Sequence, residues 1–171
     1  GEIKMTNEYT TPIFITGEAY WAKVFEPNTI NPEKLEYTID ICNLDPDNLK
    51  IAQDAGLSVK NVSAQKPEDK RGNFVTLKQF TTNYNGDPRN IRVVDAQRNP
   101  FPANTLIGNG SKVCAKAFAK AWTFGGKEGV KGYLDSLQVR ELVEYASSGP
   151  DFDVVPNGYT NNEVVDFPLA S

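Results

Sequence analysis

Apolar and polar residues alternate along most of this chain, and a period of two is the pattern of β-strands that bury one face. Within Leu35–Asn43, for example, apolar Ile39 and Ile41 flank polar Asp40. Gly17 interrupts the first long segment, and we expect a bulge or bend there. The alternation predicts strands over Pro12–Phe25, Leu35–Asn43, Asn73–Phe80, Arg89–Asp95, Ser111–Phe124 and Val130–Glu144.

The pattern changes to a helical period in one short stretch. Asp45 is a favourable N-cap, and Pro46 suits the first helical position because the backbone nitrogen there needs no acceptor. Apolar residues follow at helical spacing up to Gly56, which suits a C-terminal cap. We therefore predict one short helix that begins after Asp45 and contains Leu49, Ala52 and Ala55.

Proline, glycine and asparagine mark the connections between these elements. Asn85-Gly86 is a strong turn signal. Glu26–Lys34 and Asn99–Asn109 have the composition of loops. Val59–Asn73 is polar and carries several basic residues, so we expect a mobile basic loop there.

The strands and the single helix favour an all-β fold of the OB type, in which a five-stranded barrel closes on itself and leaves few exposed edges. A β-sandwich is the alternative architecture. From Ser147 onward the chain has no periodicity, which predicts a disordered tail. We therefore expect an OB-fold domain over residues 1–146 and a flexible acidic tail over residues 147–171.

Charge is distributed unevenly along the chain, although the net charge is only −4. Residues 60–131 carry 13 basic and 5 acidic side chains, whereas residues 1–59 carry 4 basic and 10 acidic ones. A basic middle beside acidic ends is the asymmetry expected when one face binds phosphate. The counts alone are equally consistent with charges scattered over a solvated surface.

The composition argues against several other classes of protein. The sequence contains no histidine, the commonest general base and zinc ligand, which favours a non-enzymatic protein without a metal or cofactor. Cys42 and Cys114 form no CxxC pair, and we expect reduced thiols, although a disulfide between them stays open. We see neither an apolar segment of membrane-spanning length nor a secretory signal, and expect a cytosolic protein.

Ser111–Trp122 combines small residues on one face with cations and rings on the other. The small residues suit the crowded interior of a narrow barrel. On the opposite face, ammonium groups at strand spacing can follow a phosphate backbone, and rings offer stacking surfaces for unpaired bases. Alternatively, the rings are core residues and the lysine stems pass over them. The predicted binding residues of this strand are Lys112, Lys116, Phe118, Lys120 and Trp122.

Other predicted strands repeat this mixture of ring and cation. In Asn73–Phe80 we expect Val75 and Leu77 to point inward. In Arg89–Asp95 we expect Ile91 and Val93 to point inward and Arg92, between them, to point outward. The repetition across strands favours an outward face that binds single-stranded nucleic acid without reading its sequence. These strands add Trp21, Lys23, Phe74, Lys78, Phe80 and Arg92 to the predicted binding residues.

Five segments resemble a known protein family, in order and spacing more than in identity: Ala19–Lys23, Leu35–Ile41 with the helix start at Asp45-Pro46-Asp47 that follows it, Ile91–Asp95, Leu106–Trp122 and Leu137–Val143. The family is the OB-fold single-stranded DNA-binding proteins of podoviruses, phage T-seven and its relatives. The resemblance implies a protein that coats exposed strands during phage DNA replication and recombination, in the cytoplasm of the infected bacterial host. It also implies homodimers and contacts with the phage polymerase and helicase–primase.

Members of that family carry an acidic tail that ends in an aromatic residue, competes with DNA for the basic groove and docks on partners. The resemblance therefore implies a partner-binding role for Asp151, Asp153, Glu163, Asp166 and Phe167. This tail departs from the family pattern because it is only sparsely acidic and continues past the phenylalanine to Ser171.

Three other functions stay open on the sequence. A β-barrel module that binds carbohydrate or peptide would use the same rings without needing the lysines. A structural or interaction protein of a phage would keep the rings in its core. A nuclease or other carboxylate–metal enzyme would depend on magnesium.

Overall fold

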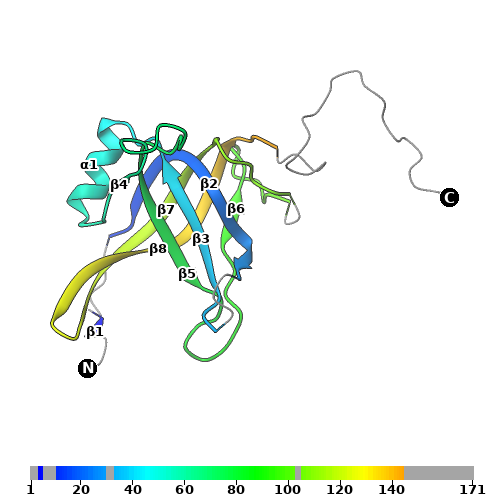
Figure 1. Ribbon diagram of the computed structural model, residues 1–171. Coiled ribbons are helices and arrows are strands. Elements are labelled where there is room, and N and C mark those ends of the chain that lie inside the picture. The colour runs from blue at the N-terminus through cyan, green and yellow to red at the C-terminus, as the bar shows by residue number, and fades with distance from the viewer. Residues whose placement is uncertain (1–3, 6–10, 30–32, 103–104, 145–171) are drawn as a thin grey trace, which may run out of the picture.

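The structure is a computed structural model that describes residues 4–5, 11–29, 33–102 and 105–144 (Figure 1). Strands dominate it, as the alternation predicts. Its elements are β1 (Lys4–Met5), β2 (Ile13–Asn28), β3 (Glu36–Cys42), α1 (Pro46–Asp54), β4 (Lys60–Asn61), β5 (Asn73–Phe80), β6 (Arg92–Val94), β7 (Ser111–Phe124) and β8 (Lys127–Glu141).

Five strands close a barrel in the order β2, β3, β5, β8 and β7 (Figure 1). Neighbouring strands are antiparallel except β5 and β8, which run parallel where Lys78 lies opposite Tyr133. The short strands β1, β4 and β6 pair with β7, β5 and β8 respectively. This strand order is that of an OB-fold barrel, so the predicted fold class is confirmed.

The barrel interior is filled by the inward residues of the alternating strands. In β3, Ile39 and Ile41 are buried, and in β7 Val113, Ala115 and Ala117 are fully buried. The small residues of β7 lie directly across from larger ones on β8, which lets the two strands share a narrow interior. The side chains of β8 that belong to this core are Leu134, Leu137 and Val139, and Tyr133 of β8 is also buried, at 9% exposure, but outside the core cluster.

Helix α1 begins as predicted, because Asp45 caps it. The backbone N–H of Asn48 donates to Oδ1 of Asp45 at 2.9 Å, and these hydrogen bonds hold the pKa of Asp45 below its usual value. Gly56 follows the last turn with φ +84°, a conformation that favours glycine. The Asn48 side chain also accepts from the backbone N–H of Thr16 at 2.8 Å, which ties the helix to β2.

Four local predictions are wrong. The register of β2 against β3 shifts between Tyr20 and Lys23 and again between Lys23 and Asn28, rather than at Gly17, where the chain instead approaches β3 so closely that a Cβ would lie 2.7 Å from the Cys42 carbonyl oxygen. β2 continues through part of the predicted loop to Asn28, and β6 has only three residues. The predicted loop at Val59–Asn73 contains β4.

The remaining expectations concern cysteines, membranes and the tail. Cys42 and Cys114 are both free. Within the described part of the chain, no helix has the length and apolarity needed to cross a membrane. The predicted tail, residues 147–171, lies outside the described residues, so the prediction that it is disordered stays a prediction.

Candidate nucleic-acid interface

A groove of about 1070 Å³ runs over the outside of the barrel where β5, β8 and β7 meet, and we call it the aromatic groove. Rings and cations line it together, as expected of a surface that binds unpaired bases and phosphates. Two acidic residues, Glu33 and Asp135, also line it. Its rings are Phe80, Tyr84, Phe118 and Tyr133, and its cations are Lys34, Arg89 and Lys120.

The strand register brings the rings of this groove together. Tyr133 lies opposite Phe118 on one side and opposite Lys78, two residues before Phe80, on the other. The rings of Phe80 and Tyr133 are consequently 6.0 Å apart, centroid to centroid, at an angle of 47°. Phe80 is 40% exposed, so one ring of the pair is open to a ligand.

Lysine ammonium groups lie over these rings. Lys131 Nζ is 4.7 Å from the Phe80 ring centroid and 5.0 Å from that of Tyr133, and Lys120 Nζ is 5.6 Å from Tyr133. Lys116 Nζ is 6.0 Å from the centroid of Phe118. Each cation therefore lies beside a surface on which a base can stack, at a position where it can reach the adjoining phosphate.

Arg89 adds a cation to the groove that it lines. Its Nε is buried and has no hydrogen-bond partner among the described residues, which is costly for a donor.

A second hollow of about 540 Å³, here called the tryptophan pocket, adjoins the aromatic groove because Lys34 lines both. Trp21 is 56% exposed at its wall, and Lys78 lies across from it on β5. Trp21 has φ +55°, and its backbone N–H donates to Oδ1 of Asn109 at 2.9 Å. A left-handed conformation costs a non-glycine residue free energy, so the bulge aims this ring outward at some expense of stability.

Phe74, one of the predicted binding residues, is buried in the structure. It points away from the barrel interior but is only 3% exposed, because the guanidinium of Arg71 covers it at 4.2 Å from the ring centroid. β4 also pairs with β5 at this position. Phe74 therefore offers no free ring face to a base in this structure.

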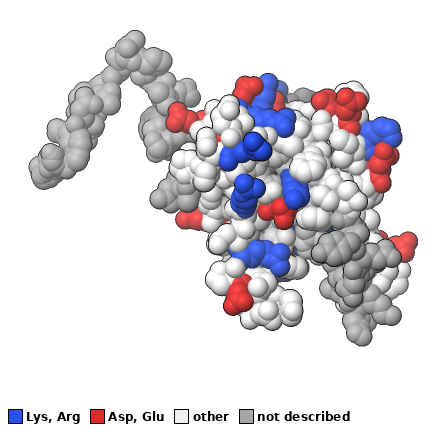
Figure 2. Space-filling view, turned by 180° about the vertical axis from the view of Figure 1, so that it is seen from behind, with Lys and Arg blue, Asp and Glu red and all other residues white. Residues whose placement is uncertain are grey.

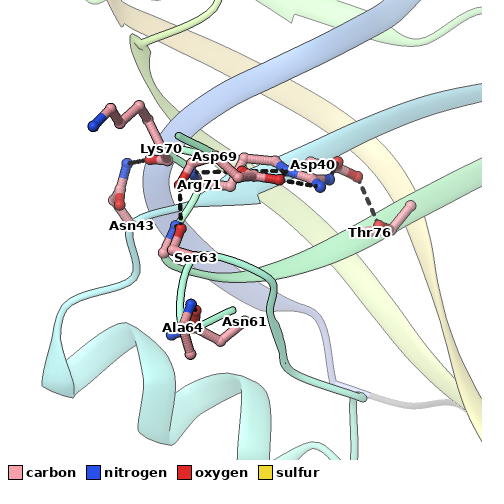
Figure 3. Close-up of polar contacts among 10 residues, drawn as sticks. Asp40, Asn43, Asn61, Ser63, Ala64, Asp69, Lys70, Arg71 and Thr76 are labelled. Carbon is pink, nitrogen blue, oxygen red and sulfur yellow. Dashed lines mark hydrogen bonds and ion pairs between the residues drawn. The ribbon is translucent and has the colours of Figure 1, made fainter. Parts of the chain in front are cut away.

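Two carboxylates, those of Asp40 and Asp69, hold the guanidinium of Arg71 in place (Figure 3). Its Nη2 donates to Asp69 Oδ2 at 2.8 Å and its Nη1 to Asp40 Oδ2 at 2.9 Å. Asp40 also accepts from the hydroxyl of Thr76 at 2.6 Å. The hydrogen bonds from Arg71 hold the pKa of Asp69 below its usual value and raise that of Arg71.

Other predicted residues lie elsewhere on the surface. Lys23 and Arg92 are brought together, but along a separate slot of about 590 Å³ that also contains Phe25 and Phe101. Those two rings stack on each other, with centroids 6.2 Å apart. The structure thus divides the predicted site between the aromatic groove, the tryptophan pocket and this slot.

Three predicted residues of β7 lie outside all three hollows: Lys112, Lys116 and Trp122. Lys112 is exposed opposite Glu141, at the start of the strand. Trp122 is half-buried near the tip of the β7–β8 hairpin, and a Cβ on Gly129 would lie 2.7 Å from its ring. One face of that indole is therefore covered. The predicted tail residues Asp151, Asp153, Glu163, Asp166 and Phe167 lie outside the described residues.

The prediction missed several lining residues, and most of them come from β8 or from loops. Tyr133 lines the groove and Lys131 lies over its rings, but Leu137 and Val139 occupy the same period-two positions of β8 and are buried in the core, so alternation alone could not identify either residue. Lys34, Tyr84 and Arg89 lie outside the strands, where period-two patterning carries no information about direction.

Basic side chains gather near the middle of the face opposite the viewer of Figure 1, with fewer acidic ones among them (Figure 2). The register places Arg92 and Lys116 on either side of Ser136, in one row across β6, β8 and β7. The expected concentration of positive charge on the surface is present, despite the net charge of −4.

The barrel, its strand order and its grooved outer face define an OB-fold protein. Among solved structures, the chain is similar to the single-stranded DNA-binding protein encoded by bacteriophage T7, with 20% sequence identity and a TM-score of 0.56 over 89% of this chain and 99% of that one. It is also similar to the single-stranded DNA-binding protein from bacteriophage Enc34 in complex with single-stranded DNA, with 12% identity and a TM-score of 0.60 over 78% and 88% of the two chains.

The Enc34 protein without that ligand gives a TM-score of 0.57 at 11% identity, over 88% of this chain and 97% of that one. The expected resemblance to phage single-stranded DNA-binding proteins is thus confirmed in three dimensions. At these identities it establishes the fold. No protein-family model and no curated protein matches the chain.

Proposed function

We propose that this protein binds single-stranded DNA without reading its sequence, by stacking bases on outward rings and pairing phosphates with neighbouring cations. The observation that carries the proposal is the aromatic groove, where Phe80, Phe118 and Tyr133 gather and each ring has a lysine ammonium group within 6.0 Å of its centroid. Stacking tolerates every base because each has a flat face.

The path that we propose for the strand follows two adjoining hollows. Phe118 and Tyr133 mark one end, and Lys34 joins the aromatic groove to the tryptophan pocket. Trp21 offers a stacking surface at the other end. Arg89, with its buried and unpaired Nε, would contact a phosphate along this path.

The solved structures that this chain resembles support the proposal, because they are phage proteins that bind single-stranded DNA. We further propose, from the same resemblance, a non-enzymatic homodimer that coats strands during phage DNA replication and recombination in the infected cell. In this proposal, the tail contacts the polymerase and the helicase–primase.

The test is a fluorescence-anisotropy titration of a labelled oligo-dT and of a duplex of equal length, at several salt concentrations. We expect preferential binding of the single strand, with a log–log salt slope of about −0.7 for each phosphate contacted. Tryptophan emission should change on binding because Trp21 lies on the proposed path. Binding that does not respond to salt would instead favour a carbohydrate or peptide ligand, and absence of binding would refute the proposal.

A further inference from the structure

Two carboxylates on the outward face of β3 each hold a cation against a ring of β5. Glu36 Oε2 lies 3.1 Å from Lys131 Nζ, which rests 4.7 Å from the centroid of Phe80. Four residues further along β3, Asp40 pairs with Arg71, which covers Phe74. Glu36 and Asp40 are both buried, so neither pair is a loose surface contact.

The two arrangements differ in how firmly the cation is held. Arg71 is shared between Asp40 and Asp69, and the ring beneath it is sealed. Lys131 forms an ion pair with one carboxylate among the described residues, that of Glu36, and Phe80 beneath it is partly exposed to the aromatic groove. Of these two rings, Phe80 is therefore the one that a ligand can uncover.

We infer that Glu36 is a positioning residue that acts as a latch: it holds Lys131 over Phe80 and Tyr133 in the free protein, and a DNA phosphate takes its place when a strand binds. This inference rests on the proposed function and concerns how the same groove opens. An ammonium group and a base cannot occupy the same face of one ring, so stacking there requires Lys131 to move.

Lys131 keeps an anionic partner of the same charge when a phosphate replaces Glu36, because a phosphodiester and a carboxylate each carry one negative charge. Glu36, in contrast, loses its cation when Lys131 turns to the phosphate. Its side chain is only 12% exposed, so leaving this carboxylate unpaired costs free energy. Glu36 therefore opposes binding, and the groove closes when no strand is present.

The first test compares Glu36→Gln with the wild-type protein in the oligo-dT titration. Glutamine keeps the length and shape of the side chain but releases the ammonium group, so we expect binding roughly fivefold tighter, as for loss of a competing ion pair of modest strength. The salt slope should become more negative by up to about 0.7. In the wild-type protein the unpaired Glu36 takes up a salt cation when DNA binds, and this uptake offsets part of the counterion release; glutamine takes up none. Unchanged or weaker binding by Glu36→Gln would overturn the latch.

Asp54→Asn is the matched control. It also removes one carboxylate charge that is paired with a lysine, because Asp54 Oδ2 lies 2.7 Å from Lys50 Nζ, but both residues are on α1 and line none of the three hollows. We expect its affinity to change by less than about twofold. Glu36→Asp, which keeps the charge, should bind more weakly than Glu36→Gln and serves as the second variant if glutamine impairs folding. An equal gain in all three variants would contradict the latch.

A double-mutant cycle separates a latch from general repulsion. In a Lys131→Met background the gain from Glu36→Gln should disappear, because there is no ammonium group to release. If the gain persists in that background, Glu36 acts only through the potential of the groove and the latch is wrong. A wild-type protein that binds no single strand would refute the proposed function itself, whereas normal wild-type binding with no gain from Glu36→Gln refutes the latch alone.

Discussion

Phe74 and Phe80 lie on the same strand and both point outward, yet the structure assigns them opposite roles. Phe80 is 40% exposed in the aromatic groove, whereas Phe74 is 3% exposed beneath Arg71. Phe80→Ala should therefore weaken binding of oligo-dT by about 1–3 kcal/mol, the worth of one stacked base. Phe74→Ala should leave affinity unchanged but lower the free energy of unfolding by about 3–5 kcal/mol, as for other buried phenylalanines.

Two assays on the same pair of variants test this reasoning. Anisotropy titration gives the dissociation constant, which should rise roughly 5- to 150-fold for Phe80→Ala. Denaturant unfolding gives the free energy of unfolding, which should change much more for Phe74→Ala than for Phe80→Ala. The reasoning is refuted if Phe74→Ala loses affinity as Phe80→Ala does while keeping its stability, because Phe74 would then be a stacking surface.

Three further predictions follow from single side chains. Arg89→Met should weaken oligo-dT binding and make the salt slope less negative by about 0.7. The control variant Lys50→Met, on α1, should change neither the affinity nor the slope. Equal effects of the two substitutions would exclude a phosphate contact at Arg89. The pKa of Asp45 is lowered below 3.8 in the folded protein, so its contribution to stability is complete above that pH and is lost as the pH falls through the folded pKa. The Asp45→Asn variant keeps a capping side chain, so its melting temperature should fall less on acidification than that of the wild-type protein. An equal fall in both proteins would contradict the assignment. Burial raises the pKa of the Cys42 thiol, so a thiol reagent at pH about 8 should modify this cysteine only after unfolding, as peptide mass spectrometry can show, and rapid modification of the native protein would contradict its burial.

The elements that could be predicted from sequence are those set by local interactions. β7 was predictable to the residue because one face consists of small side chains and the other of cations and rings. Helix α1 was predictable because its cap and first turn lie within a few residues of each other. Neither required knowledge of which strands pair.

The parts of the site that sequence patterning missed depend on bulges and on distant partners. The register between β7 and β8 shifts at Asp135, so Tyr133 points outward although Leu137 and Val139, at the same period-two positions, point inward. A simple alternation would therefore place Tyr133 in the core. Phe74 shows the converse: its outward direction was correct, but its burial depends on Arg71, which is anchored by Asp40 from another strand and covers the ring.

The most direct test of the account is to map where a single strand touches the protein. Photocrosslinking of an oligonucleotide that contains 5-iodo-deoxyuridine, followed by peptide mass spectrometry, identifies the ring nearest each base. The account predicts crosslinks at Trp21, Phe80 and Phe118. Crosslinks confined to Phe25 and Phe101, in the separate slot, would contradict it.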